Sequence, residues 1–403
     1  MNTQPLVSPA TPMPAARIVA LIGLTLTLAY IVVLGGAWMS GHWLTDAQGR
    51  PIANDFVNVF AAGQLALEGH AAQAYDWTIH KAMEVRAVGY DFGSYYGWHY
   101  PPTFLFAAAM LALMPYAAAA LIWLGTTLAL YAAAIRAIVG ERAGLFLAFG
   151  FPAALWNVTA GQNGFLTAAL IGGTLLLLER RPVLAGLCLG LLTYKPQFGQ
   201  LFPFVLLAAG HWRALFAAAM TALALIAASL LAFGGEAWTA FFHWMPVTSR
   251  VVLGDGGADW DRLQSLFGLV RSHGGSELMA WALQIVATLG ALGTVCWLWR
   301  SRAPYDLKAA ALACGALLAT PYLYMYDLVV LAVPVAFLVR HALARGFTSM
   351  ETLMLPLGSA LLLIYPYVKT QVGLTAVLIV AVLIAQRLIV SSPAISPTHT
   401  TRG

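Results

Sequence analysis

Long apolar runs separated by short polar breaks extend along almost the whole chain. A helix needs about 20 apolar residues to cross a bilayer, so such runs predict membrane-spanning helices. Together the runs leave room for roughly 12–13 spans. We therefore expect an all-α polytopic membrane protein. The candidate spans are 18–39, 103–114, 116–138, 144–158, 162–179, 183–194, 197–210, 214–233, 277–299, 309–324, 327–340, 349–365 and 372–390.

Several of these runs are too short to cross alone, and they end at polar or aromatic breaks. Backbone without helical hydrogen bonds is tolerated at membrane depth only where it lines a protein-enclosed or water-filled cavity. Short runs with such ends therefore indicate a cavity open to one face of the membrane. The runs 103–114 and 116–138 cannot both cross if Arg142 is cytoplasmic, so we expect one of them to be only partly inserted. The breaks are Trp156-Asn157, Tyr194-Lys195-Pro196 and Pro321-Tyr322.

Two long, less apolar stretches divide the chain. We expect a cytoplasmic tail, a single transmembrane domain with two extracytoplasmic loops, and a polar tail at the end. The cytoplasmic tail covers residues 1–17, and the transmembrane domain covers 18–390. The two extracytoplasmic loops within this domain are 41–101 and 234–276, and the polar tail is 391–403.

The first loop contains a predicted amphipathic helix over 54–68. Asn54 is a suitable cap for a helix that starts at Asp55, and Gly69 is a plausible end. Apolar residues recur at helical spacing on one face, so we expect this helix to lie along the membrane interface above the bundle and to help roof the cavity. These residues are Phe56, Val59, Phe60, Gly63 and Leu67.

Composition and charge exclude the other large classes of protein. Only 9% of the 403 residues are charged and 61% are hydrophobic, whereas a soluble domain has about 25% charged residues. The net charge of +5 arises from short basic clusters between the apolar runs, as in cytoplasmic loops under the positive-inside rule. We therefore expect a multi-pass protein of an inner or plasma membrane, with the lipid bilayer and not nucleic acid as its partner.

Two ionisable residues at breaks are candidates for chemistry. Asp55 is either a general base at a cavity on the outer membrane surface or a first-turn residue that only satisfies backbone donors. Lys195 precedes the helix-breaking Pro196, and a cation between apolar runs usually has a partner. It either contacts an anion or snorkels to the interface.

The aromatic run from Tyr322 to Asp327 either holds a sugar ring or forms an interfacial tyrosine belt. Two further polar breaks of the same type are Gly161-Gln162-Asn163-Gly164 and His99-Tyr100-Pro101-Pro102. In the second loop, a solvated charge cluster is favoured over a site; it comprises Arg250, Arg262, Arg271, Asp255, Asp259 and Asp261. The histidines are scattered, so their spacing predicts no metal site.

Several short motifs occur in an order that resembles glycosyltransferase family 87. This family consists of polytopic GT-C enzymes whose best-known members are polyprenol-phosphate-mannose-dependent α-mannosyltransferases. The resemblance covers about residues 18–340. The motifs are Asn54-Asp55-Phe56, Ala62-Gly63, Gly69 with Ala74-Tyr75-Asp76, Tyr100-Pro101-Pro102, Gly161-Gln162 with Gly164, Gly186 with Lys195-Pro196, and Thr320-Pro321.

The resemblance implies a GT-C helical bundle whose long first extracytoplasmic loop carries amphipathic helices. It implies inverting transfer of a mannose-like hexose from a polyprenyl-phosphate sugar to a hydroxyl of a glycolipid or glycan acceptor, on the extracytoplasmic face. The family's acidic residue corresponds to Asp55, as general base, and its Lys-Pro position to Lys195, as a contact of the donor phosphate. No metal or other cofactor is expected, because a lipid-phosphate donor carries no nucleotide diphosphate.

The remaining expected site residues surround these two. Alongside Lys195, His99 or Arg250 is expected to contact the phosphate. Where relatives carry a His after the late Thr-Pro motif, this chain has Tyr326-Asp327. The expected substrate pocket comprises Tyr100, Gln162, Asn163, Tyr322, Tyr326 and Asp327.

Two alternatives remain open. The chain could be a transporter or flippase of lipid-linked sugar, although it lacks the inverted pair of interrupted helices that many transporters show. It could also be an inactive binding subunit of the same fold, which the altered Tyr326-Asp327 motif allows.

Overall fold

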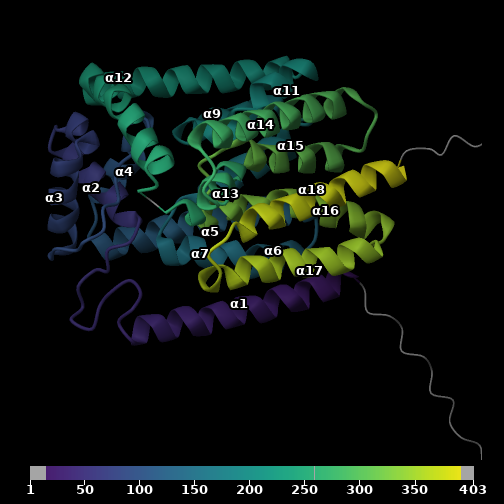
Figure 1. The fold of residues 1–403 in the computed structure, drawn as a ribbon, viewed down its shortest axis with the longest axis horizontal. Helices are drawn as coiled ribbons and strands as arrows, with labels where there is room; N and C mark the ends of the chain where they lie inside the picture. The colour runs from purple at the N-terminus through teal and green to yellow at the C-terminus, as the bar shows by residue number, and fades with distance from the viewer. Residues whose placement is uncertain (1–14, 258, 392–403) are drawn as a thin grey trace, which may run out of the picture.

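Helices form the described part of the chain, which covers residues 15–257 and 259–391 of the computed structural model, and no strand occurs there (Figure 1). The expected all-α polytopic fold is confirmed. Seven helical segments are long and apolar enough to cross a membrane: Ala15–Met39, Tyr116–Val139, Trp212–Gly254, Glu277–Arg300, Met325–Arg345, Ser349–Tyr367 and Val372–Val390. Most of the two expected tails, 1–17 and 391–403, lies outside the described residues.

This count is lower than the 12–13 expected spans. An eighth span results if α6 (Ala143–Gly150) and α7 (Pro152–Ala160), which bend by 52° at their junction, are taken as one. The described residues also contain apolar helices that are too short to cross a membrane alone. These are α2 (Phe56–Leu67), α4 (Leu105–Ala112, preceded by η2, Pro102–Phe104), α8 (Gly164–Leu177) and α9 (Pro182–Leu191, followed by η3, Leu192–Tyr194).

The two ends of the bundle differ in composition. At one end, which we call the basic end, α5 (Tyr116–Val139), α14 (Glu277–Arg300) and α16 (Ala332–Arg345) all have an Arg in the last turn. Arg340 Nη1 donates to the carbonyl oxygen of Ile138 at 3.5 Å, which places the ends of α5 and α16 side by side.

At the opposite end, which we call the loop end, three segments far apart in sequence meet. The backbone N–H of Gln264 donates to the carbonyl oxygen of Leu323 at 2.6 Å. The side-chain amide of Gln371 donates to the carbonyl oxygen of Trp260 at 3.1 Å. This end contains η5 (Trp260–Arg262), α13 (Leu266–Ser272), the start of η6 (Met325–Leu331) and the turn η7 (Tyr365–Tyr367) between α17 (Ser349–Ile364) and α18 (Val372–Ser391).

Helix α2 is buried, and our expectation of an interfacial amphipathic helix was wrong. Residues on all of its faces are buried, including Phe56, Val57 and Asn58. It packs against α4 so closely that a Cβ on Gly63 would collide with the carbonyl group of Ala108. The helix has almost no polar residues to present to water, so it is more stable inside the protein.

The structure also resolves the question of the paired runs 103–114 and 116–138. Helix α4 is short, and α5 alone extends through the bundle. The ring of Tyr116 packs on Phe56 at 5.4 Å between centroids, whereas Ile138 lies at the basic end. Of the two runs, only 116–138 therefore forms a helix that is long enough to cross a membrane.

The runs 183–194 and 197–210 form a hairpin and do not cross singly. Helix α9 begins after Arg181, and the chain returns through α10 (Pro196–Gly199) and α11 (Phe202–Ala208) to His211. The His211 ring lies 5.8 Å from Trp299, at the basic end. Lys195 therefore lies at the tip of the hairpin, where Pro196 starts a new helix.

Helix α12 (Trp212–Ser249) is bent and contributes to the loop end. Gly234 has φ 76° and ψ 163°, which interrupts the helix where the expected span 214–233 ends. The second half lies against the first loop, where Trp244 stacks on Trp77 of α3 (Trp77–Val88) with 5.8 Å between centroids. It continues as a π-helical turn, η4 (Arg250–Gly254). The remaining elements are η1 (Ala71–Tyr75) and α15 (Tyr305–Ala319).

Candidate functional site

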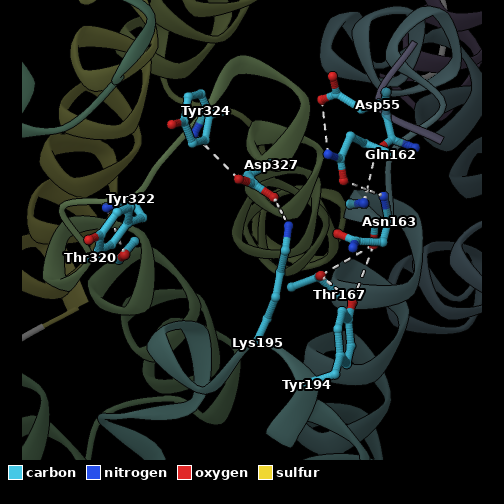
Figure 2. A network of polar contacts seen from close by, with 12 residues as sticks. Asp55, Gln162, Asn163, Thr167, Tyr194, Lys195, Thr320, Tyr322, Tyr324 and Asp327 are labelled. Carbon is cyan, nitrogen blue, oxygen red and sulfur yellow. Dashed lines mark hydrogen bonds and ion pairs between the residues drawn. The ribbon is translucent and has the colours of Figure 1, made fainter. Parts of the chain in front are cut away.

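Asp55 lies at the loop end, at the residue before α2, and is held by a side chain from another part of the chain. Its Oδ2 accepts a hydrogen bond from Gln162 Nε2 at 2.9 Å (Figure 2). Asn54 lies one residue before the N-cap, and its Oδ1 accepts a hydrogen bond from the backbone N–H of Phe56 at 3.0 Å. The carboxylate of Asp55 is therefore left free for other contacts, and no cap bond to it is formed.

The turn 161–164 connects this carboxylate to the rest of the site. A Cβ on Gly161, whose φ is +71°, would lie 2.9 Å from Asn54 Oδ1, and one on Gly164 would lie 2.5 Å from the carbonyl oxygen of Tyr326. The two glycines allow the turn to fit between the start of α2 and η6. Gln162 is thereby directed at Asp55.

Three expected pocket residues join Asp55 in one hydrogen-bond network. Tyr100 Oη donates to Gln162 Oε1 at 3.3 Å, and Asn163 Nδ2 donates to Tyr100 Oη at 2.7 Å. Figure 2 shows the network continuing from Asn163 to Thr167 and Tyr194, whose hydroxyls lie 2.6 Å apart. Both ends of the Gln162 amide are bonded, its nitrogen to Asp55 and its oxygen to Tyr100 Oη and the backbone N–H of Asn163, so the network holds this amide in one orientation.

Lys195 and Asp327 form a buried ion pair facing this network. Lys195 Nζ lies 2.6 Å from Asp327 Oδ1, and the two side chains are only 7% and 3% exposed. The ammonium also lies 5.5 Å from the ring centroid of Tyr326, which stacks on Tyr324. Asp327 has a second role, because its other oxygen accepts the backbone N–H of Tyr324 and caps η6. The site thus combines a cation, two carboxylates and tyrosine rings.

The electrostatics of Asp55 suit proton transfer. Burial raises the pKa of Asp55 to about 6, while the hydrogen bond from Gln162 and the charge of Lys195 act in the opposite direction. The charge of Asp327 raises it further, and that of Arg262 lowers it. Asp55 therefore changes its protonation state close to neutral pH, as an effective general base must.

The remaining expected residues lie further from the ion pair. His99 is exposed, and its Nδ1 lies 3.3 Å from Thr248 Oγ1 of α12. Arg250 is exposed just after α12. Within the described part of the chain, no hydrogen bond or ion pair connects either of them to Lys195. Tyr322 packs with a small apolar cluster around Phe267.

Arg262 is the residue that our sequence analysis missed, because we assigned it to a solvated cluster. It is exposed and paired with Asp259, yet its charge also acts on Asp55. No local pattern distinguishes it from Arg250 or Arg271. Among residues 15–257 and 259–391, no group of three or more His, Cys, Asp or Glu side chains is arranged to hold a metal ion.

These features define a multi-pass helical membrane protein with a polar site at one end of the bundle. The model of glycosyltransferase family 87 matches residues 98–321, more than half of the chain, and the chain belongs to this family. Membership indicates a membrane glycosyltransferase. The match contains Tyr100, Gln162 and Lys195, whereas Asp55 and Asp327 lie outside it. No curated protein and no solved structure matches the chain.

Proposed function

We propose that the protein transfers a mannose-like hexose from a polyprenyl-phosphate sugar to a hydroxyl of a glycolipid or glycan acceptor, with inversion at the anomeric carbon. The observation that carries this proposal is the position of Asp55. Burial raises the pKa of Asp55 to about 6, and the hydrogen bond from Gln162 orients its carboxylate. The charges of the buried Lys195–Asp327 pair also act on this carboxylate.

In the proposed reaction, Asp55 accepts the proton of the acceptor hydroxyl as its oxygen attacks the anomeric carbon. The bond between that carbon and the phosphate oxygen breaks on the opposite face of the sugar, which inverts the configuration. The phosphate leaves with the bonding electrons, and Asp55 releases its proton to solvent afterwards. A positioned base of matching pKa contributes about 10²–10⁴-fold to the rate.

Lys195 would stabilise the departing phosphate, on which negative charge grows in the transition state. The pairing with Asp327 holds the ammonium in place before the donor binds, and Arg262 supplies a second positive charge on the Asp55 side. We base the phosphate contact on Lys195. His99 and Arg250 stay predictions as further contacts of the phosphate.

The sidedness of the site follows from the charge rule. The basic end, with the Arg residues that close α5, α14 and α16, matches cytoplasmic loops. Asp55 and Asp327 lie at the opposite end, so we propose that the site faces the extracytoplasmic side of an inner or plasma membrane. A lipid-phosphate donor has no diphosphate to coordinate, so the proposed reaction uses no metal ion and should persist in EDTA.

One observation favours a second candidate function. Asp327 neutralises Lys195, which would weaken the attraction of that cation for a phosphate. This pairing is compatible with a catalytically inactive subunit that binds lipid-linked sugar. The third candidate, a flippase, would carry the lipid-linked sugar across the membrane unchanged.

The proposal is tested with purified protein in lipid, a panel of radiolabelled polyprenyl-phosphate sugars and membrane extract as acceptor. Wild type is compared with Asp55→Asn and with Asp91→Asn, which alters an exposed carboxylate in the same loop. We expect transfer by wild type and Asp91→Asn, and a loss of at least about 100-fold in Asp55→Asn.

Equal turnover by Asp55→Asn would exclude Asp55 as the base. If folded wild type transfers no sugar from any donor, the transferase proposal is wrong. Translocation of unchanged donor in the same vesicles would then identify a flippase, and donor binding alone would identify a binding subunit.

A further inference from the structure

A polar cavity of about 380 Å³ lies at the loop end. Its volume is within the range of about 300–1,000 Å³ that is typical of small-ligand sites. Two segments line it, one before and within η5 and the other at the turn between α17 and α18. The lining residues are Asp259, Asp261, Arg262, Tyr365, Pro366, Val368 and Lys369.

The two walls of this cavity are held together by hydrogen bonds. Gln371 Nε2 donates to the carbonyl oxygen of Trp260 at 3.1 Å, and the backbone N–H of Gly373 donates to Gln264 Oε1 at 2.8 Å. Gln371 and Gln264 are both buried. The cavity is therefore preformed, which lowers the entropic cost of binding a ligand.

The cavity presents polar groups that the protein itself leaves available. Within the described part of the chain, neither the Asp261 carboxylate nor the Lys369 ammonium has a hydrogen-bond or ion-pair partner. Asp259 and Arg262 form a pair at 3.3 Å, but their side chains are 66% and 64% exposed. Such an exposed pair is weak, so a ligand could displace it readily.

The charges in the cavity are balanced, which indicates the class of ligand. Two carboxylates would repel an anion, and the Arg and Lys would repel a cation. A neutral molecule with several hydroxyls can donate to Asp261 and accept from Lys369 at the same time. Tyr365 adds a half-buried ring, fixed by packing on Trp156 at 6.3 Å between centroids.

Arg262 connects this cavity to the proposed reaction centre. It lines the cavity, and its charge also acts on Asp55 and on Tyr324. A ligand in the cavity would therefore contact a residue whose charge acts on the carboxylate that would remove a hydroxyl proton.

We propose that this cavity, which we call the acceptor pocket, binds neutral sugar units of the acceptor and thereby places the reacting hydroxyl near Asp55. The inference rests on the transferase function proposed above, and it adds the acceptor's binding site and chemical class. Arg262 is a positioning residue in this scheme, because it is shared between the pocket and the base.

The first test measures binding without catalysis. Methyl hexopyranosides are added to the full-length protein in detergent, and their contact with it is followed by saturation-transfer NMR. We expect specific binding by wild type and by Asp255→Asn, which alters an exposed carboxylate of the same loop outside the cavity. The double variant Asp261→Asn/Lys369→Ala should bind at least about tenfold more weakly.

The second test measures transfer by the same variants. The double variant should raise the acceptor KM about tenfold, with kcat and the donor KM within about twofold of wild type. Unchanged thermal unfolding would show that the variant is folded.

The outcomes of the two tests separate this inference from the transferase function. If glycosides bind in the pocket but no sugar is ever transferred, the pocket is supported and the transferase function is wrong. If transfer occurs while the double variant changes neither the acceptor KM nor glycoside binding, the acceptor pocket is wrong. Displacement of the glycoside by inorganic phosphate at low concentration would show an anion site and would also overturn the inference.

Discussion

Gln162 and Asp55, 107 residues apart in the sequence, are joined by a hydrogen bond of 2.9 Å from the amide of one to the carboxylate of the other. The bond stabilises the ionised carboxylate against the burial that disfavours it. It also fixes the direction in which the free oxygen of Asp55 points. The following predictions depend on this relationship and on the ion pair beside it.

The pH dependence of transfer should report the protonation of Asp55. A general base must be ionised, and burial raises the pKa of Asp55 to about 6. We therefore expect kcat/KM to rise as the pH increases through about 6 and to level off above it, with a tenfold fall per pH unit below. A rate that stays constant between pH 5 and 7, measured with saturating donor, would contradict this assignment.

Replacement of Gln162 should move that profile. In Gln162→Leu the carboxylate loses the hydrogen bond that lowers its pKa, so the acidic limb should shift to higher pH. Gln73→Leu is a suitable control, because Gln73 lies in η1 and, among the described residues, no hydrogen bond joins its side chain to the site. A merely structural role of Gln162 would reduce the rate at every pH and leave the position of the limb unchanged.

The sequence alone indicated which residues could carry chemistry at this site. Asp55 and Lys195 were identifiable because ionisable groups are rare in this chain and both lie at breaks between apolar runs. The all-α membrane fold followed from the length of those runs. The glycines of the 161–164 turn and the neighbouring Gln162 were also visible as a polar break.

Tertiary contacts determined the remaining features, and local patterns do not encode them. Nothing near Lys195 in the sequence indicates that Asp327, 132 residues later, neutralises it. The apolar spacing of α2 fits an interfacial helix as well as a buried one, and only the close approach of Gly63 to α4 distinguishes the two. The sequence around Arg262 resembles the sequence around Arg250, and both side chains are exposed. That the charge of Arg262 acts on Asp55 therefore depends on the fold.

The Lys195–Asp327 pair should behave as a buried ion pair. Lys195→Met or Asp327→Asn leaves one partner without its counterpart, which typically costs about 3–5 kcal/mol. The double variant Lys195→Met/Asp327→Leu removes both charges and should regain most of the loss in thermal stability. Glu68→Gln breaks the exposed pair with Arg86 and should cost at most about 1 kcal/mol.

Activity of the double variant then separates the two roles of Lys195. If stability returns while transfer remains lost, the ammonium acts on the donor phosphate. Transfer at the wild-type rate by the stable double variant would show that the pair is only structural. Thermal unfolding in detergent and the radiolabel assay, run on the same preparations, give both values.

The close packing of Gly164 against η6 predicts the effect of a single methyl group. In Gly164→Ala the new Cβ would lie 2.5 Å from the carbonyl oxygen of Tyr326 and 2.7 Å from Asn157 Oδ1, so η6 or the turn must move. Overpacking of this kind costs about 1–3 kcal/mol, and it would displace Asp327 relative to Lys195. We expect a lower Tm and a larger loss of transfer than the loss of stability explains.

Gly125→Ala in α5, where nothing lies within 4 Å, should leave Tm unchanged or slightly raised, because Ala favours a helix over Gly. Wild-type Tm and turnover in Gly164→Ala would show that the turn does not hold η6 in place.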